Sequence, residues 1–237
     1  MRRLAIFFIL AGAATVAAGC KSDNAAQAPN KAETSSANAP ASEPQAAAPA
    51  PVEDSRPLIV CFGDSLTAGY GTDPGESYPD YLQRDLDHQS YRYRVVNAGV
   101  SGNTTKDGIN RLDSVIAMKA AVVIVEFGGN DGLRGLPIED SRTNLDTILA
   151  KLKASGTQVV IAGITLPPNY GAAYIKQFDA TYTLLAKKYD LPLMPFLLKD
   201  VYNVPGMMQA DETHATAGGN KIVADDVLEL IKPLMKK

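Results

Sequence analysis

A serine that follows Gly and Asp is the first residue whose type and surroundings could support catalysis. The segment Gly63–Leu66 reads Gly-Asp-Ser-Leu and comes directly after an apolar run, so Ser65 is expected where a buried strand ends. A serine hydroxyl is a weak nucleophile until a neighbouring base accepts its proton, and that base is usually a histidine. The chain holds two histidines, His88 and His214, and each lies three residues after an aspartate.

The position of each histidine in the expected fold separates these two candidates. The helix expected over 77–88 would begin on the same side as Ser65 and run away from it, and twelve helical residues span about 18 Å. His88 is therefore expected at the opposite edge, as a surface residue at a helix C-terminus, where positive charge is mildly favoured. His214 precedes the last expected helix, on the Ser65 side, and Asp211 could orient its ring. We predict Ser65 as nucleophile, His214 as base and Asp211 as the residue that orients it.

An oxyanion formed at Ser65 would also need hydrogen-bond donors. The candidates are the backbone N–H of Ser65, the backbone N–H of Gly102 and the side-chain amide of Asn130. Removing one such donor typically costs about 2.7–4 kcal/mol of barrier. Each candidate has a plainer explanation, because Gly, Asn and Ser also fill turns and strand ends. The prediction therefore depends on their convergence at one edge of a sheet.

Five apolar runs predict β-strands, and the stretches between them predict helices. The strands are expected over 58–62, 93–97, 121–127, 158–164 and 193–195, and the helices over 77–88, 104–117, 141–154, 171–189 and 216–235. Continuous apolar runs are typical of strands that are covered on both faces. The alternation predicts an α/β fold with a parallel sheet, in which ligands bind beyond the carboxyl ends of the strands.

The first twenty residues have the pattern of a bacterial lipoprotein signal. A basic start precedes an apolar run over 4–16, which is shorter than the roughly 20 residues that a membrane span requires. The segment ends in Ala-Ala-Gly-Cys, so we predict that Cys20 is lipidated and anchors the protein to a membrane. Lys21, where an Asp would retain the protein in the inner membrane, favours the periplasmic side of the outer membrane. Cleavage without lipidation, which would give a secreted protein, is the alternative.

The remaining chain divides by composition into a linker and one domain. Residues 21–55 are Ala-, Pro- and Ser-rich and cannot bury enough apolar surface to fold, so we predict a disordered linker there and a single domain over 56–237. The net charge of −3 gives no reason to expect a nucleic-acid partner. No cluster of His, Cys or carboxylates has the spacing of metal ligands, so no metal site is expected.

Four blocks of this chain resemble the signature blocks of the SGNH (GDSL) hydrolase family. They are Gly63–Leu66, Gly102, Gly129–Asp131 with Asn130 between, and Asp211-x-x-His214. The segments Leu166–Gly171 and Pro192–Phe196 add to the resemblance, which covers residues 57–235. Within the family the chain is similar to bacterial acyl thioesterases, lysophospholipases and arylesterases.

The resemblance implies a flavodoxin-like three-layer sandwich, with five parallel strands and helices on both faces of the sheet. It implies an acyl-serine intermediate, no cofactor, and an oxyanion hole formed by Ser65, Gly102 and Asn130. It also implies that the substrate is bound by the residues Asp131, Gly132, Leu133, Leu166 and Pro167. Substrates would be small acyl compounds: lysophospholipids, fatty acyl esters or thioesters, and aryl esters. We expect the protein to act as a monomer.

Two departures from the family pattern flank the histidine. Glu212 replaces a Gly and Ala215 replaces a Pro of the usual Asp-Gly-x-His-Pro block, and neither side chain is catalytic. Two other functions remain open on sequence grounds. One is a deacetylase of acetylated cell-wall or capsule carbohydrates, which chain-length preference would distinguish. The other is a non-catalytic binding lipoprotein, against which the presence of the whole candidate triad argues.

Overall fold

A five-stranded sheet is the centre of the computed structural model, which describes residues 54–237. The strands are β1 (Leu58–Gly63), β2 (Arg94–Gly99), β3 (Val122–Glu126), β4 (Gln158–Ala162) and β5 (Leu193–Met194). Their order is β2-β1-β3-β4-β5, and every neighbouring pair is parallel. The α/β fold class predicted from the sequence is confirmed.

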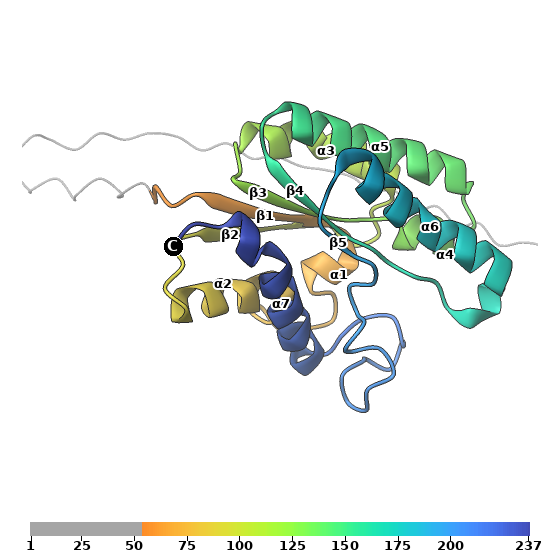
Figure 1. Cartoon of the computed structure of the whole chain (residues 1–237). Helices are drawn as coiled ribbons and strands as arrows, with labels where there is room; N and C mark the ends of the chain where they lie inside the picture. Colours follow the sequence, from red (N-terminus) through yellow and green to blue (C-terminus); the bar gives the residue numbers. More distant parts are fainter. Residues whose placement is uncertain (1–53) are drawn as a thin grey trace, which may run out of the picture. The chain divides into compact units, whose positions relative to one another are not determined.

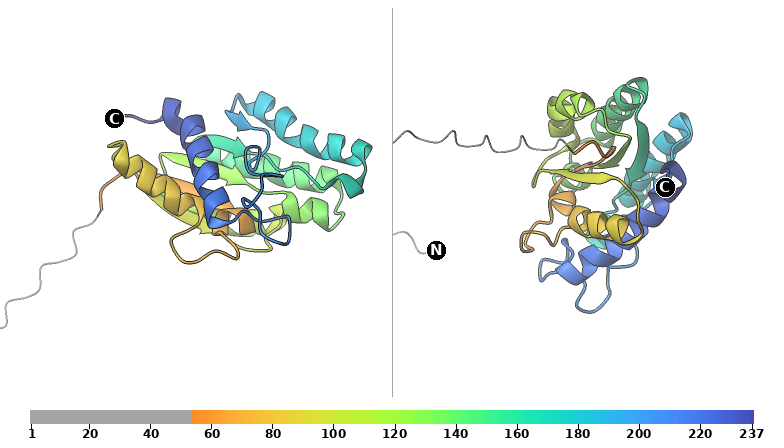
Figure 2. Two further views of the ribbon diagram at one scale, coloured as in Figure 1. Left: turned by 90° about the horizontal axis from the view of Figure 1, so that it is seen from below. Right: turned by 90° about the vertical axis from the view of Figure 1, so that its left-hand side faces the viewer.

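Helices cover both faces of the sheet, which gives three layers (Figure 1, Figure 2). On one face α2 (Tyr78–His88) packs against α7 (Ala217–Ile231). The other face carries α3 (Thr105–Ala117), α5 (Ile138–Ala154) and α6 (Ala172–Tyr189). Two short helices, α1 (Ser65–Ala68) and α4 (Gly129–Leu133), directly follow the ends of β1 and β3, and a 3₁₀ turn occupies Pro168–Tyr170.

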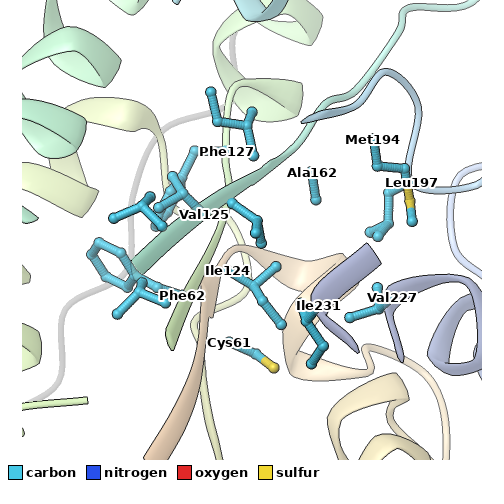
Figure 3. Packing of buried hydrophobic residues seen from close by; sticks show 14 of the residues in the cluster. Cys61, Phe62, Ile124, Val125, Phe127, Ala162, Met194, Leu197, Val227 and Ile231 are labelled. Carbon is cyan, nitrogen blue, oxygen red and sulfur yellow. The ribbon is translucent and has the colours of Figure 1, made fainter. Parts of the chain in front are cut away.

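The apolar runs of β1 and β3 supply the core on both sides of the sheet, because successive strand residues point to opposite faces. Cys61 pairs in register with Ile124, and both point toward Val227 and Ile231 of α7 (Figure 3). Phe62 lies on the opposite side of the sheet (Figure 3). These side chains are all fully buried, so the sheet is held between two apolar layers.

Two helix boundaries differ from the sequence prediction by three or more residues, each for a local reason. Helix α5 begins at Ile138 rather than 141, because Pro137 takes the N-cap position and Glu139 and Asp140 place negative charge in the first turn. Helix α7 ends at Ile231 rather than 235, because Pro233 cannot continue an α-helix.

The predicted signal segment, the lipidation site Cys20 and almost all of the predicted linker lie outside the described residues. Among residues 54–237, none of the helices is long and apolar enough to cross a membrane.

Candidate active site

Ser65 occupies the first position of α1, one residue after the turn that ends β1. Asp64 caps this short helix, and its Oδ1 atom accepts a hydrogen bond from the backbone N–H of Leu66 at 3.1 Å. Gly63 has no room for a side chain, since a Cβ atom there would lie 2.1 Å from Thr67 Oγ1 and 2.4 Å from Glu126 Oε2. The tight strand-to-helix turn therefore fixes the place of the Ser65 hydroxyl.

The loop between β5 and α7 brings His214 to this hydroxyl. His214 Nε2 lies 2.9 Å from Ser65 Oγ, although the two residues are 149 positions apart in the chain. On the other side of the ring, His214 Nδ1 lies 2.6 Å from Asp211 Oδ2. The three predicted triad residues thus form one continuous hydrogen-bonded chain. His88 lies instead at the exposed C-terminal end of α2.

Asp211 is held in place by its own loop. Its Oδ1 atom accepts the backbone N–H groups of Thr213 and His214, both at 3.0 Å. Partial burial raises the pKa of Asp211, but the hydrogen bonds from His214 and Thr213 outweigh burial and lower it below its ordinary value. Asp211 is therefore an anion at neutral pH, which suits a residue that stabilises an imidazolium.

Tyr70 and Gln209 connect the two loops that lie beside the imidazole of His214. The ring of Tyr70 lies 4.7 Å from the imidazole, centroid to centroid. The side chain of Gln209 donates to the carbonyls of Tyr70 and Ala215, at 2.7 and 2.8 Å. The loop after α1 and the loop before α7 are thereby tied together. The contacts of Tyr70 with His214 and with Gln209 join segments that are far apart in the chain, so the sequence did not predict them.

The three predicted oxyanion donors have different surroundings. Within the described part of the chain, the backbone N–H groups of Ser65 and Gly102 donate to no other protein group. Asn130 differs, because its Nδ2 atom already donates to Asp64 Oδ2 and to the carbonyl of Asn103, both at 3.0 Å. The Asn130 amide is therefore firmly oriented, and an oxyanion would have to share it with these two oxygens.

A pair of buried acids lies behind the nucleophile. Glu126, at the end of β3, accepts hydrogen bonds through Oε2 from Thr67 Oγ1 at 2.8 Å and from the backbone N–H of Asp64 at 3.1 Å. Burial raises the pKa of Asp64 to about 6, and burial followed by the nearby Asp64 raises the pKa of Glu126 well above its ordinary value. Glu126 thus supports the turn at Ser65, a role for which the sequence carried no signal beyond its place at a strand end.

A largely apolar cavity of about 680 Å³ opens onto this constellation. Ser65, Asn130 and His214 line it together with apolar side chains from α4, from α6 and from the loops after β4 and β5. The principal apolar residues are Leu133, Leu166, Pro167, Ile175, Phe196 and Leu198. Such a cavity can take an acyl chain next to the Ser65 hydroxyl.

The five predicted substrate-binding residues divide into two groups. Leu133, Leu166 and Pro167 line the cavity, whereas Asp131 and Gly132 are buried behind it.

The Asp131 carboxylate is directed away from the cavity. It accepts the backbone N–H and the hydroxyl of Thr105, at 2.9 and 2.5 Å, and the hydroxyl of Ser141 at 3.1 Å. Gly132 lies where a Cβ atom would come within 2.6 Å of Leu166. These two residues therefore position the cavity wall and do not form its surface.

The segment 131–137 is tied to neighbouring segments by three hydrogen bonds. Tyr170 donates its hydroxyl to the Leu133 carbonyl at 2.8 Å, and Tyr174 donates to the Leu136 carbonyl at 3.3 Å. Arg134 donates to the Gly102 carbonyl at 2.9 Å. The cavity wall is thus connected to the loop that carries a candidate oxyanion donor.

No group of three or more His, Cys, Asp or Glu side chains within residues 54–237 is arranged to hold a metal ion.

Comparison with known protein families identifies the family to which this chain belongs. The family described as GDSL-like Lipase/Acylhydrolase matches residues 61–222. The chain belongs to this family. As a member it is an enzyme, a serine ester hydrolase.

Individual relatives agree with the family assignment. The chain is 40% identical over 178 residues to "Esterase TesA" of Pseudomonas aeruginosa, which covers 75% of this chain and 89% of the relative. It is 36% identical to "Thioesterase 1/protease 1/lysophospholipase L1" of Escherichia coli, over 75% of this chain and 84% of that protein. A crystal structure of TesA superposes with a TM-score of 0.72 at 40% identity, covering 75% of this chain and 99% of the other.

Proposed function

We propose that the protein hydrolyses acyl esters through an acyl-Ser65 intermediate. The observation that carries the proposal is the hydrogen-bonded chain Asp211–His214–Ser65 at the mouth of an apolar cavity. Ser65 Oγ attacks the ester carbonyl while His214 Nε2 accepts its proton, and Asp211 stabilises the imidazolium. His214 then gives the proton to the leaving alcohol or thiol, and the acyl group stays on Ser65.

Hydrolysis of the intermediate repeats these steps with water. His214 accepts a proton from the attacking water, and the bond between the acyl carbon and Ser65 Oγ breaks as Oγ recovers that proton. In both steps the negative carbonyl oxygen is stabilised by the N–H groups of Ser65 and Gly102 and by the shared amide of Asn130.

The cavity supports acyl chains longer than acetyl as substrates. Its volume of about 680 Å³ and its apolar walls fit a fatty acyl group of a lysophospholipid, a fatty acyl ester or thioester, or an aryl ester. A deacetylase of cell-wall or capsule carbohydrates would need little of this apolar space. We therefore favour the acyl-chain substrates over the deacetylase and over a non-catalytic binding role.

A series of p-nitrophenyl esters from acetate to palmitate tests both the mechanism and the substrate class. We expect kcat/KM to peak at a chain longer than acetate and to fall by about 10⁴-fold or more in Ser65→Ala and His214→Ala. Ser114→Ala is the matched control, because Ser114 is an exposed serine on α3. A peak at acetate would favour the deacetylase, and full activity in Ser65→Ala would exclude the serine mechanism.

We further propose that lipidated Cys20 anchors the enzyme, as a monomer, to the periplasmic face of the outer membrane. The support is the basic start, the short apolar run and the Ala-Ala-Gly-Cys sequence at the N-terminus. Cys20→Ser should move the protein from the membrane fraction to the soluble periplasm, and metabolic labelling with palmitate should disappear. An unchanged membrane fraction would contradict the anchor.

A further inference from the structure

Arg111, on α3, binds three oxygen atoms at or just beyond the carboxyl ends of β1 and β2. Its Nη2 donates to the Gly63 carbonyl at 2.7 Å, its Nη1 to the Ala98 carbonyl at 2.7 Å, and its Nε to Asn103 Oδ1 at 2.8 Å. All three acceptors are uncharged amide oxygens. The guanidinium group therefore acts here as a three-armed hydrogen-bond donor and not as a member of an ion pair.

Two aromatic rings fix the plane of this guanidinium group. Its central carbon lies 4.5 Å from the ring centroid of Phe62 and 5.4 Å from that of Phe127. The two rings themselves meet edge to face, with centroids 4.9 Å apart. Phe62 and Phe127 are fully buried beside the ends of β1 and β3, so Arg111 rests on the core of the domain.

The three acceptors belong to the two segments that must meet around an oxyanion. Gly63 precedes the turn that places Ser65, and its carbonyl also accepts the backbone N–H of Val100 at 3.1 Å. Asn103 follows Gly102 directly, and its carbonyl accepts the amide of Asn130 at 3.0 Å. The three proposed oxyanion donors are therefore all close to groups that Arg111 binds. Ser65 is two residues after Gly63, Gly102 directly precedes Asn103, and the Asn130 amide donates to the Asn103 carbonyl.

We propose that Arg111 is a positioning residue of the hydrolase reaction, which holds the Ser65 turn and the Gly102 loop in register so that their N–H groups converge on one oxygen. The proposal rests on the proposed function, because it assigns those N–H groups to the oxyanion hole. Arg111 is not among the residues that line the cavity, so it acts through the loops and does not touch the substrate.

Lysine could not replace arginine in this role. An ammonium group keeps the charge, but it cannot reach three acceptors held in the plane of a guanidinium fork or stack on two rings in the same way. If the positive charge alone mattered, Arg111→Lys would keep activity. If the three directed hydrogen bonds matter, Arg111→Lys and Arg111→Met should lose activity to a similar extent.

The test measures kcat and KM of the purified full-length protein on p-nitrophenyl butyrate, with the melting temperature as a check of folding. We expect kcat to fall by about 30- to 300-fold in both Arg111→Lys and Arg111→Met, with KM changed less than about threefold, because misplaced donors weaken the transition state and not the ground state. Arg142→Met is the matched control, a partly buried arginine on α5 bonded to Glu139 and Thr181, and it should keep the parent kcat.

Two further measurements keep the proposal testable if these variants unfold. Asn103→Ala removes one acceptor and leaves Arg111 in place, and we expect kcat to fall by about 3- to 10-fold. In Arg111→Ala, millimolar guanidinium should raise kcat several-fold, whereas equal sodium chloride should not.

Several results would overturn the positioning role. They are a folded Arg111→Lys with kcat within about threefold of the parent, a loss expressed only in KM, or a loss that follows the unfolded fraction. Failure of the proposed function would give a different result. Ser65→Ala would then remain active, whatever activity the Arg111 variants showed.

Discussion

The two halves of the active site are built in different ways. Ser65 follows a strand that is buried from Ile59 onward, and its neighbours Asp64, Thr67 and Glu126 are all buried. Glu126 accepts hydrogen bonds from both Asp64 and Thr67. His214 and Asp211 lie on a loop, and their side chains are 15% and 42% exposed. The nucleophile is thus an extension of the core, whereas the base is held by local hydrogen bonds at the surface. Substitutions on the Ser65 side should therefore affect stability and activity together, and removal of a catalytic side chain on the His214 side should lower activity with little change in stability.

The largest effect is expected on the surface side. Asp211→Asn should lower kcat by about 10²- to 10⁴-fold, because the neutral amide no longer stabilises the imidazolium or selects its tautomer. The free energy of unfolding should change by less than about 1 kcal/mol, since the Asp211 side chain is 42% exposed and an asparagine oxygen can still accept the loop N–H groups. Steady-state kinetics and urea titration check both parts. Asp200→Asn, at an exposed aspartate paired with Lys199, should alter neither quantity appreciably.

Asp64→Ala should affect both quantities. It removes the cap of α1 and leaves the Asn130 amide without one acceptor, so we expect a loss of about 2–3 kcal/mol in unfolding free energy and about 10-fold or more in kcat. Urea titration measures the loss of unfolding free energy, and steady-state kinetics measures the loss of kcat. A variant that lost activity but kept its full stability would break the distinction between the two halves.

Glu126→Gln should change how stability depends on pH. The folded pKa of Glu126 is raised above its ordinary value of 4.5, so the folded state binds more protons than the unfolded state between 4.5 and that raised pKa. The contribution of this group to stability is therefore present below about pH 4.5 and is lost as the pH rises through the folded pKa. Glutamine cannot ionise, so the stability of the variant relative to the parent should increase from pH 4 to pH 8.

Urea titrations across this pH range measure that difference. Glu139→Gln is the control for the loss of one carboxylate, because the Glu139 side chain is 76% exposed. A pH-independent difference between Glu126→Gln and the parent would show that the buried acid does not titrate differently in the folded state.

The smallest expected effect concerns strain in the base loop. Glu212 has a φ of +54°, a conformation that favours glycine, and it stands where the family pattern has a glycine. Glu212→Gly should raise the free energy of unfolding by about 0.5 kcal/mol, the relief of strain less the added entropy of the unfolded chain. Asp190→Gly, at φ +52° after α6, should give a similar gain far from the site. A loss of stability in Glu212→Gly would mean that its side chain supports the loop.

Much of the fold could be predicted from the sequence, because the buried strands are continuous apolar runs with clear ends. The short helices α1 and α4 could not, since four or five residues give no periodicity and α4 begins with glycine. The chain order of the strand ends also predicted that Ser65 and His214 would meet, because parallel strands share one carboxyl edge.

The supporting residues were less accessible to sequence reasoning. Arg111 lies on a helix, where arginine usually faces solvent, and its role follows only from the register that places Gly63, Ala98 and Asn103 around it. Asp131 was expected to bind substrate, and the structure turns its carboxylate toward Thr105 and Ser141. The neighbours in space of a polar side chain at a strand end decide its direction. Those neighbours come from distant parts of the chain, so the sequence does not show them.

Covalent labelling of Ser65 tests the central claim most directly. The full-length protein would be treated with a p-nitrophenyl alkylphosphonate, and the modified peptide would be identified by mass spectrometry. We expect one phosphonyl group per chain, on Ser65, with release of one equivalent of p-nitrophenol and loss of all esterase activity, and no labelling in Ser65→Ala. Full activity after treatment, or a label on another residue that accounts for the lost activity, would contradict an acyl-Ser65 mechanism.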